Sequence, residues 1–313
     1  MGRADELHNI CFIALMGVNH NYHPQGATMP FLTSDGMTEL ETSKTLKLDS
    51  YDIHYHELGS GDPILFLHSY GPGSTGWLTF HKILGSFSQN YRCIVMDLAN
   101  YGGTGPIEYN EPVHSVHARV AKTLLDTLEI DQITLIGNSV GATTSMVFAL
   151  ENPDRVKKLI IGGCHASTGG DPYVIANYPS EGLRVTQATF ANPTDEALLW
   201  YLKVHLDNPD LITDELFDYV KSSLNQHPEY QEAQRKSYSV PHSNLSELAN
   251  IKIPTLIIHG RFDRMVTVEQ GLTIMGYLSQ CSRLVVLNNC GHWPPFEQPD
   301  LYTRYAMDFL KEG

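Results

Sequence analysis

The sequence has 313 residues of ordinary globular composition, 42% hydrophobic and 18% charged, which excludes a disordered, collagen-like or low-complexity chain. Its 35 acidic residues outnumber the 21 basic ones and leave a formal net charge of −14. That balance excludes the basic surface that binding to nucleic acid or an anionic membrane requires, so a small molecule is the expected partner.

The first 43 residues show no clean hydrophobic period, and we interpret them as an N-terminal extension of uncertain order. Their apolar run, Ile10–Val18, is about half as long as a membrane span. Acidic Asp5 and Glu6 precede it, where a signal peptide carries positive charge. The five cysteines of the chain form no C-x-x-C pair, which is typical of a reducing compartment. We therefore expect a cytoplasmic protein.

Two short strands are predicted at Thr45–Leu48 and Tyr51–Leu58, with a turn over residues 59–63. Continuous apolar runs follow, and segments of helical period, such as Val116–Leu128 and Ala142–Leu150, separate most of them. Buried strands that alternate with helices predict an α/β fold, with a mostly parallel sheet covered on both faces. The predicted buried strands are Ile64–Leu67, Cys93–Met96, Ile133–Ile136, Leu159–Ile161 and Thr255–Ile258.

The alternation stops over residues 166–250, where no strand-like apolar run occurs. Thr194–Leu206 and Thr213–Leu224 in this stretch have helical period and helix-start signals. We predict an all-helical cap over 166–250, inserted into a core formed by residues 44–165 and 251–313. Such a cap is expected to cover the carboxyl ends of the strands, where ligands bind in α/β folds.

A G-x-S-x-G sequence at residues 137–141 lies between a predicted strand and a predicted helix. In that position it predicts a nucleophile elbow, a sharp turn whose glycines let the backbone and the helix approach closely. Ser139 is the predicted nucleophile, and the amide of Val140 is one predicted oxyanion donor. Because a serine hydroxyl needs a base to remove its proton, an acid and then a histidine are expected downstream.

Asp263 and His292 satisfy this order. Asp263 follows the strand Thr255–His259, and His292 follows another short apolar run, Leu284–Leu287. Taken singly, the two are equally well explained as a turn residue and a surface histidine. Three elements at matching strand ends in the expected order instead predict a Ser-Asp-His triad. A triad and water complete a hydrolytic cycle, so no metal or other cofactor is expected.

The loop after the strand Ile64–Leu67 is expected to supply the second oxyanion donor. By position, this donor is the backbone amide of Tyr70 or Gly71. The alternative is a glycine- and proline-containing turn without a role in chemistry.

From about residue 45, the chain resembles the α/β-hydrolase fold, and within it the meta-cleavage product hydrolases, which hydrolyse a C–C bond in ring-opened aromatic acids. The motifs that carry the resemblance are Gly71–Trp77, Gly137–Ser139, Leu211–Leu216 and Cys290–Trp293. The resemblance implies a serine hydrolase that acts on a 2-hydroxy-6-oxo-dienoate-like product of aromatic degradation, and a homo-oligomer. It also implies that the substrate meets Ser69, Thr79, Asn138 and Trp293.

One departure from the family bears on the substrate. The cap helix that begins near Leu216 normally carries an Arg for the dienoate carboxylate, and Val220 stands there in this chain. Lys221 is the adjacent cation and the predicted carboxylate contact, although Lys does not form the bidentate fork of Arg. Arg184 and Arg235 are the other candidates in the cap.

Two further functions are compatible with these motifs. A carboxylesterase, lactonase or amidase uses the same triad on a less acidic substrate. A non-catalytic binding protein on the same scaffold is the third reading, but such a protein does not need all three triad residues.

Histidine pairs and a cysteine offer further sites. His54 and His56 share a strand face, and His114 and His117 share a helix face. Neither pair has further ligands at a metal-binding spacing, so we interpret both as solvated faces and predict no metal site. Cys164 follows a predicted strand and is interpreted as a small buried residue. No G-x-G-x-x-G follows the first strand, so no dinucleotide site is predicted.

Overall fold

The computed structural model describes residues 31–166 and 179–312. Within them, an eight-stranded sheet has the order β1-β2-β4-β3-β6-β7-β9-β10. β2 runs antiparallel to both of its neighbours, and all later pairs are parallel, as the sequence predicts. The strands are β1 Ser43–Lys47, β2 Asp52–Leu58, β3 Asp62–Leu67, β4 Tyr91–Met96, β6 Ile133–Asn138, β7 Val156–Gly162, β9 Thr255–Gly260 and β10 Cys281–Leu287.

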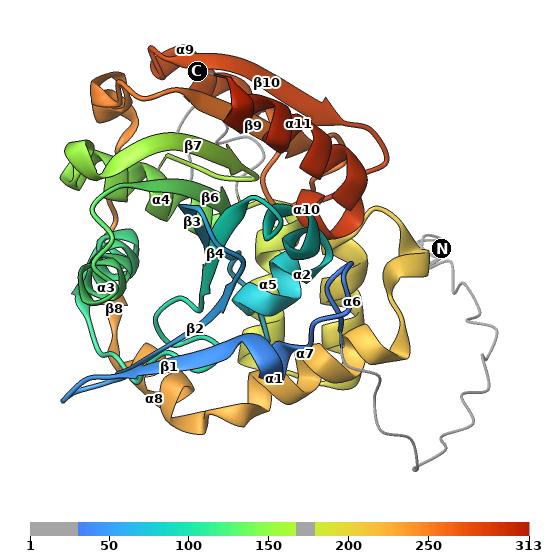
Figure 1. Cartoon of the computed structure of the whole chain (residues 1–313). Coiled ribbons are helices and arrows are strands. Elements are labelled where there is room, and N and C mark those ends of the chain that lie inside the picture. The colour runs from blue at the N-terminus through green and yellow to red at the C-terminus, as the bar shows by residue number, and fades with distance from the viewer. Residues whose placement is uncertain (1–30, 167–178, 313) are drawn as a thin grey trace, which may run out of the picture.

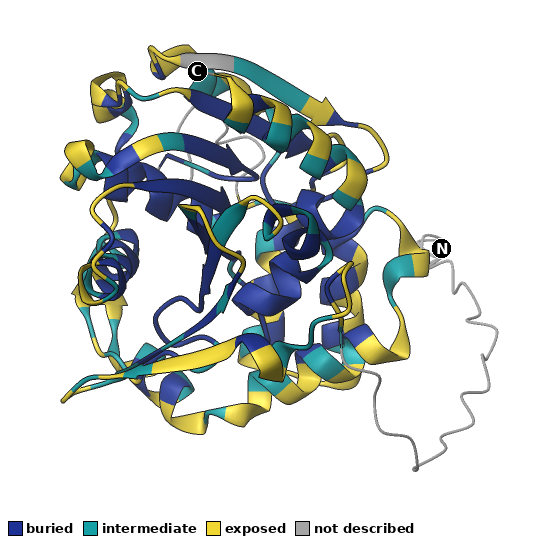
Figure 2. Cartoon of the chain, in the orientation of Figure 1, coloured by how far each residue is buried: buried dark blue, intermediate teal, exposed yellow. Residues whose placement is uncertain are grey.

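Helices cover both faces of the sheet (Figure 1). Side chains alternate across a strand, so Leu65 and Leu67 of β3 enter one core while Ile64 and Phe66 enter the other. The central strands are therefore buried on both sides, whereas β1 at the edge is largely exposed (Figure 2). The helices of the first core are α3 Val113–Thr127, α4 Val140–Glu151 and α9 Val268–Tyr277; those of the second are α2 Gly76–Phe87 and α11 Pro299–Lys311. α10 (Pro294–Glu297) packs instead, through Phe296, in the cluster that contains the cap residues.

The cap contributes α5 Glu181–Ala191, α6 Asp195–His205, α7 Asp214–Gln226 and α8 Pro228–Lys236. It contacts the loops that follow three strands: Gly182 N donates to Arg264 O at 3.0 Å, His292 N to His205 O at 2.8 Å, and Gln234 Nε2 to Asn100 O at 3.3 Å. The cap thus lies over the carboxyl ends of the strands.

The cap differs from the all-helical segment that the sequence predicts. The cap is not all-helical, because β8 (Tyr238–Ser239) pairs with β5 (Asn110–Glu111) in a separate two-stranded sheet. The reason is that the end of the cap runs beside the core backbone, where Tyr238 N donates to Tyr109 O at 2.9 Å. Residues 167–178 of the predicted cap lie outside the described residues.

Part of the predicted N-terminal extension packs on the domain. The ring of Phe31 lies 4.9 Å from that of His81 and 5.2 Å from that of Tyr219, and Trp77 Nε1 donates to Phe31 O at 3.1 Å. α1 (Glu39–Thr42) then leads directly into β1. Residues 1–30 lie outside the described residues. In the described part of the chain, each helix is too short or too polar to cross a bilayer.

Candidate active site

β6 and α4 meet at Ser139, which has φ 56° and ψ −121°. A non-glycine residue at such angles stores strain, and strain of this kind gathers at functional sites. The flanking glycines are sterically required: a Cβ on Gly141 would lie 1.9 Å from Leu67 O, and one on Gly137 would lie 2.5 Å from Gly141 O. Ser139 N donates to Gly162 O at 2.8 Å, which fixes the turn on β7. The backbone here has the form of a nucleophile elbow.

The predicted oxyanion loop is held beside this turn. Gly141 N donates to His68 O at 3.0 Å. Leu98 N donates to His68 Nε2 at 2.9 Å, so the ring proton sits on Nδ1 and is donated to Ser69 O at 2.8 Å. Both Tyr70 and Val140 line the cavity in front of Ser139. Because Val140 is the first residue of α4, its amide has no acceptor within the helix.

Gly71, the alternative to Tyr70, packs under the cap. Its φ is 152°, and a Cβ there would lie 2.1 Å from the Tyr201 hydroxyl oxygen. The described residues that line the cavity include Tyr70 but not Gly71. Tyr70, and not Gly71, thus belongs to the described wall of the cavity in which the second donor is expected.

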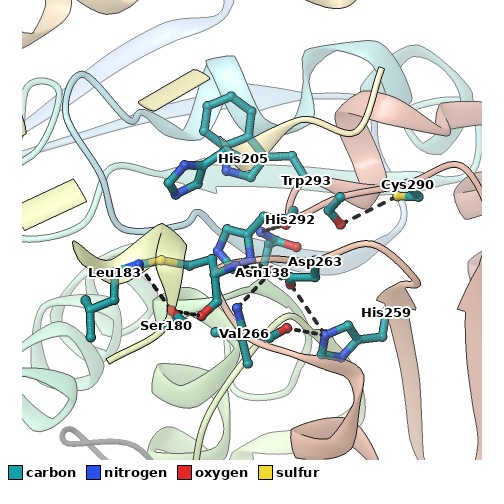
Figure 3. Close-up of polar contacts among 12 residues, drawn as sticks. Asn138, Ser180, Leu183, His205, His259, Asp263, Val266, Cys290, His292 and Trp293 are labelled. Atoms are coloured by element: carbon teal, nitrogen blue, oxygen red, sulfur yellow. Dashed lines mark hydrogen bonds and ion pairs between the residues drawn. The ribbon is translucent and has the colours of Figure 1, made fainter. Parts of the chain in front are cut away.

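Asp263 and His292 form a buried hydrogen-bonded pair in the loops that follow β9 and β10 (Figure 3). His292 Nδ1 lies 2.8 Å from Asp263 Oδ2, and the other carboxylate oxygen accepts from the amides of Met265 and Val266, both at 2.8 Å. Burial alone would raise the pKa of Asp263, but the electrostatic interaction with His292 and hydrogen bonds from His259 and His292 hold it well below its usual range. Asp263 is therefore ionised and orients the imidazole.

Two hydrogen bonds hold the backbone of His292. Asn138 Nδ2 donates to His292 O at 3.1 Å, and His292 N donates to His205 O of the cap at 2.8 Å. A Cβ on Gly163 would lie 3.3 Å from His292 Cε1, so the ring lies against the end of β7, next to the elbow. Its Nε2 is buried and has no hydrogen-bond partner among the described residues. That nitrogen is positioned to exchange a proton with a group in the site.

Glu297, which the sequence pattern did not single out, holds the loop that carries His292. Its buried carboxylate accepts from the amides of Gly291 and Trp293, both at 3.0 Å, and from that of Asp207 at 2.8 Å. It thereby fixes both sides of His292 and joins them to the cap. A lone carboxylate after the apolar and proline residues 293–296 is the signal that identifies it.

A cavity of about 400 Å³ opens in front of Ser139, between the core and the cap. Cys164 lines it, but burial raises the pKa of its thiol to about 12, so it stays protonated and is no nucleophile. Among the described lining residues, none is Lys, Arg, Asp or Glu. The polar ones are Tyr70, Tyr101, Tyr109, His114, His117, Ser139, Thr143, His165, Gln187, Gln234 and Ser239.

Four predicted substrate contacts lie elsewhere, outside the described lining of this cavity. Ser69 is fully buried in the oxyanion loop. Thr79 donates to Thr75 O within α2, and Trp293 packs with Tyr201 and His205 in the cap cluster. Asn138 holds the His292 backbone. The structure shows these four residues in packing and positioning contacts, and their contact with a substrate stays a prediction.

The structure places Lys221 away from the described wall of this cavity, so its predicted contact with the substrate gains no support. Val220 is buried and packs on Gly73, where a Cβ would lie 2.2 Å from Val220 O. The next helical residue points about 100° away, and Lys221 forms an exposed ion pair with Asp195 at 2.7 Å. The other two candidates are also exposed: Arg184 donates to Pro179 O, and Arg235 pairs with Glu232.

Replacement of Lys221 by Ala is therefore expected to leave the KM for an acidic substrate within about twofold of wild type, because an exposed ion pair is worth only about 0–1 kcal/mol. Steady-state kinetics at low and moderate salt tests this. A rise in KM of tenfold or more would show that Lys221 contacts the substrate.

The interpretation of the histidine pairs as solvated faces is wrong. His56 is buried because β2 lies inside the sheet, between two other strands. His114 and His117 are buried because α3 packs on the sheet with the helix face that carries them. His54 is held by Asp97, with its Nδ1 2.6 Å from Asp97 Oδ2. Within residues 31–166 and 179–312, no three His, Cys, Asp or Glu side chains gather as a metal site would require.

Comparison with known proteins gives two kinds of match. The family model for the alpha/beta hydrolase fold matches residues 62–299. A 2-hydroxy-6-oxo-6-phenylhexa-2,4-dienoate hydrolase of Comamonas testosteroni is 33% identical over 88% of this chain and 99% of its own. A 2-hydroxy-6-oxononadienedioate/2-hydroxy-6-oxononatrienedioate hydrolase of Dechloromonas aromatica is 32% identical over 89% of this chain and 98% of its own.

A solved structure agrees with the fold. The meta-cleavage product hydrolase of Pseudomonas fluorescens IP01, complexed with acetates, superimposes with a TM-score of 0.74 at 24% identity. The match covers 87% of this chain and 98% of that one.

Proposed function

The chain belongs to the alpha/beta hydrolase fold family, among relatives that are meta-cleavage product hydrolases, and on this premise we propose that it hydrolyses a C–C bond in a 2-hydroxy-6-oxo-dienoate-like ring-fission product. In this proposal Ser139 is the nucleophile, His292 the base and Asp263 its orienting acid. The amides of Val140 and Tyr70 form the oxyanion hole. The observation that carries it is the buried Asp263–His292 pair beside a strained serine turn.

The first half of the reaction is acyl transfer. The Ser139 hydroxyl attacks the carbonyl carbon next to the scissile bond while His292 Nε2 takes its proton. Two amides stabilise the negative charge that develops on the carbonyl oxygen. The dienoate must first pass to its keto tautomer, in which the 2-hydroxyl has lost a proton, C5 has gained one, and C2 is a carbonyl conjugated with the C3–C4 double bond. The tetrahedral intermediate then collapses, and the C5–C6 bond breaks as its electron pair moves through C4 and C3 into that carbonyl. His292 returns the proton to that leaving group.

The second half releases the acid. Water, deprotonated by His292, attacks the acyl group on Ser139 and passes through the same oxyanion hole. The ester bond to Ser139 breaks, and the serine oxygen recovers its proton. One molecule of water is consumed, and the products are a carboxylic acid and a dienoic acid.

One observation favours the second candidate, a carboxylesterase, lactonase or amidase. Among its described lining residues the cavity has no Lys or Arg, and a buried carboxylate without a partner costs several kcal/mol. A neutral ester, lactone or amide avoids that cost.

Comparison of two substrates separates the candidates. We expect kcat/KM for 2-hydroxy-6-oxo-6-phenylhexa-2,4-dienoate to exceed that for p-nitrophenyl butyrate by at least about a hundredfold, or roughly 2.7 kcal/mol of transition-state binding. Absorbance assays measure both at one pH and ionic strength. Faster turnover of the ester would replace the C–C hydrolase with the esterase.

A further inference from the structure

Two histidines that the proposed chemistry does not use stand in the wall of the cavity. His114 and His117 lie three residues apart on α3, on the same helix face. They are 5% and 2% exposed, and both line the cavity that also contains Ser139. α3 therefore places two imidazoles within the enclosure where the proposed substrate reacts.

Their electrostatic surroundings differ from those of other histidines in this chain. His54 faces Asp97, His227 faces Glu229 and His292 faces Asp263. By contrast, the titratable groups that act on His114 among the described residues are His165 and His242, and those that act on His117 are His114 and His68. His114 and His117 thus have further imidazoles as neighbours. Groups that can become positively charged favour a bound anion and disfavour a bound cation.

In the absence of an anion, both rings are neutral at pH 7. Burial, reinforced by neighbouring histidines, lowers the pKa of His114 to about 4 and that of His117 well below its usual value. In the free protein, these two positions therefore carry no buried positive charge and little of the associated desolvation free energy. An anion placed against these rings reverses the effect, because a nearby opposite charge favours the protonated imidazole.

Hydrogen bonds determine the tautomer of His117. The amide of Ala99 donates to His117 Nδ1 at 3.2 Å. An amide N–H only donates, so Nδ1 is unprotonated and Nε2 carries the proton of the neutral ring. His114 Nδ1 lies 3.4 Å from the Thr144 hydroxyl of α4. His117 thus offers an N–H donor even before it takes up a second proton.

We propose that His114 and His117 bind the carboxylate of the substrate and take up a proton from solvent as it binds. The proposal rests on the proposed function in one respect, namely that the natural substrate is an acid. It explains how the cavity accepts an anion although its described wall contains no Lys or Arg. The imidazoles donate N–H groups to the carboxylate oxygens, and the proton gained by one ring balances the charge.

Proton uptake is the direct test. Titration calorimetry of the Ser139→Ala variant with 2-hydroxy-6-oxo-6-phenylhexa-2,4-dienoate, in buffers of different ionisation enthalpy, should show uptake approaching one proton. By linkage, Kd then rises with pH by up to about tenfold per unit. The His114→Asn/His117→Asn double variant should lose most of this uptake. No uptake in the Ser139→Ala variant, or full uptake in the double variant, would overturn the proposal.

Single substitutions give an independent readout. In His117→Asn, the Asn Oδ1 can replace Nδ1 as acceptor for the Ala99 amide, but the N–H donor at Nε2 is lost. His114→Asn is the equivalent single substitution at the other histidine. We expect each to raise the KM for the dienoate about tenfold or more and to leave the KM for p-nitrophenyl butyrate within about twofold. His227→Asn, outside the cavity, is the matched control and should change neither. Unchanged KM for the dienoate, or equal effects on both substrates, would refute the site.

The two proposals fail in different ways. If the wild-type enzyme does not turn over the dienoate, the C–C hydrolase function is refuted. The measurement of proton uptake when the same acid binds still tests whether His114 and His117 bind its carboxylate, because that measurement requires no catalysis.

Discussion

Replacement of Ser139 by Ala is expected to lower kcat about 10⁴-fold or more, because it removes the hydroxyl proposed to form the acyl intermediate. The fold should persist. Ala keeps the same Cβ, so the strain at φ 56° is unchanged, and the glycine contacts on either side are untouched. The measurements are kcat on the best substrate and Tm of the purified variant.

Ser145→Ala is the matched control for this experiment. Ser145 lies on the same helix, is fully buried, and donates to Gly141 O at 2.8 Å, but it is not among the described residues of the cavity wall. Its loss removes one neutral hydrogen bond, worth about 1 kcal/mol of stability, and should leave kcat within about threefold. Ser139→Ala retaining more than about a tenth of wild-type kcat would exclude Ser139 as nucleophile.

Asp263→Asn is expected to lower kcat about 10³- to 10⁴-fold through the tautomer of His292. The amides of Met265 and Val266 both donate to Oδ1, so the Asn oxygen must stay there and its NH₂ group must face His292. Nδ1 of the imidazole then has to accept, which moves the proton to Nε2. In that tautomer Nε2 cannot take the proton of Ser139.

The comparison variant is Asp195→Asn, the same substitution at an exposed cap residue whose partner is Lys221. It should leave kcat unchanged. Near-normal activity of Asp263→Asn, with a folded protein by circular dichroism, would mean that another group orients His292.

Strand and elbow positions were predictable from local pattern. The apolar runs at Cys93–Met96 and Ile133–Ile136 lie inside β4 and β6 as the structure has them, because a strand covered on both faces needs apolar residues at every position. Ser139, Asp263 and His292 follow strands β6, β9 and β10. Parallel strands bring their carboxyl ends to one edge, so residues far apart in sequence were expected to meet there.

The roles of other site residues depended on orientation rather than on position. Lys221 and Val220 are neighbours in sequence, and only the packing of α7 on Gly73 shows that Val220 turns inward. His114 and His117 have the spacing of a solvated helix face as much as of a buried one. Their burial follows from how α3 rotates against the sheet and α4, which the residue pattern leaves open.

By itself, the sequence determined the α/β class, and it predicted the insertion of the cap and the proposed order of nucleophile, acid and base, since these depend on hydrophobic period and on short motifs at strand ends. Only the tertiary structure decided which side chains form the cavity wall, that Glu297 holds the His292 loop, and that residues from Phe31 onward pack on the core. The physical reason is that local pattern specifies an element, whereas the direction of a given side chain depends on long-range contacts between elements.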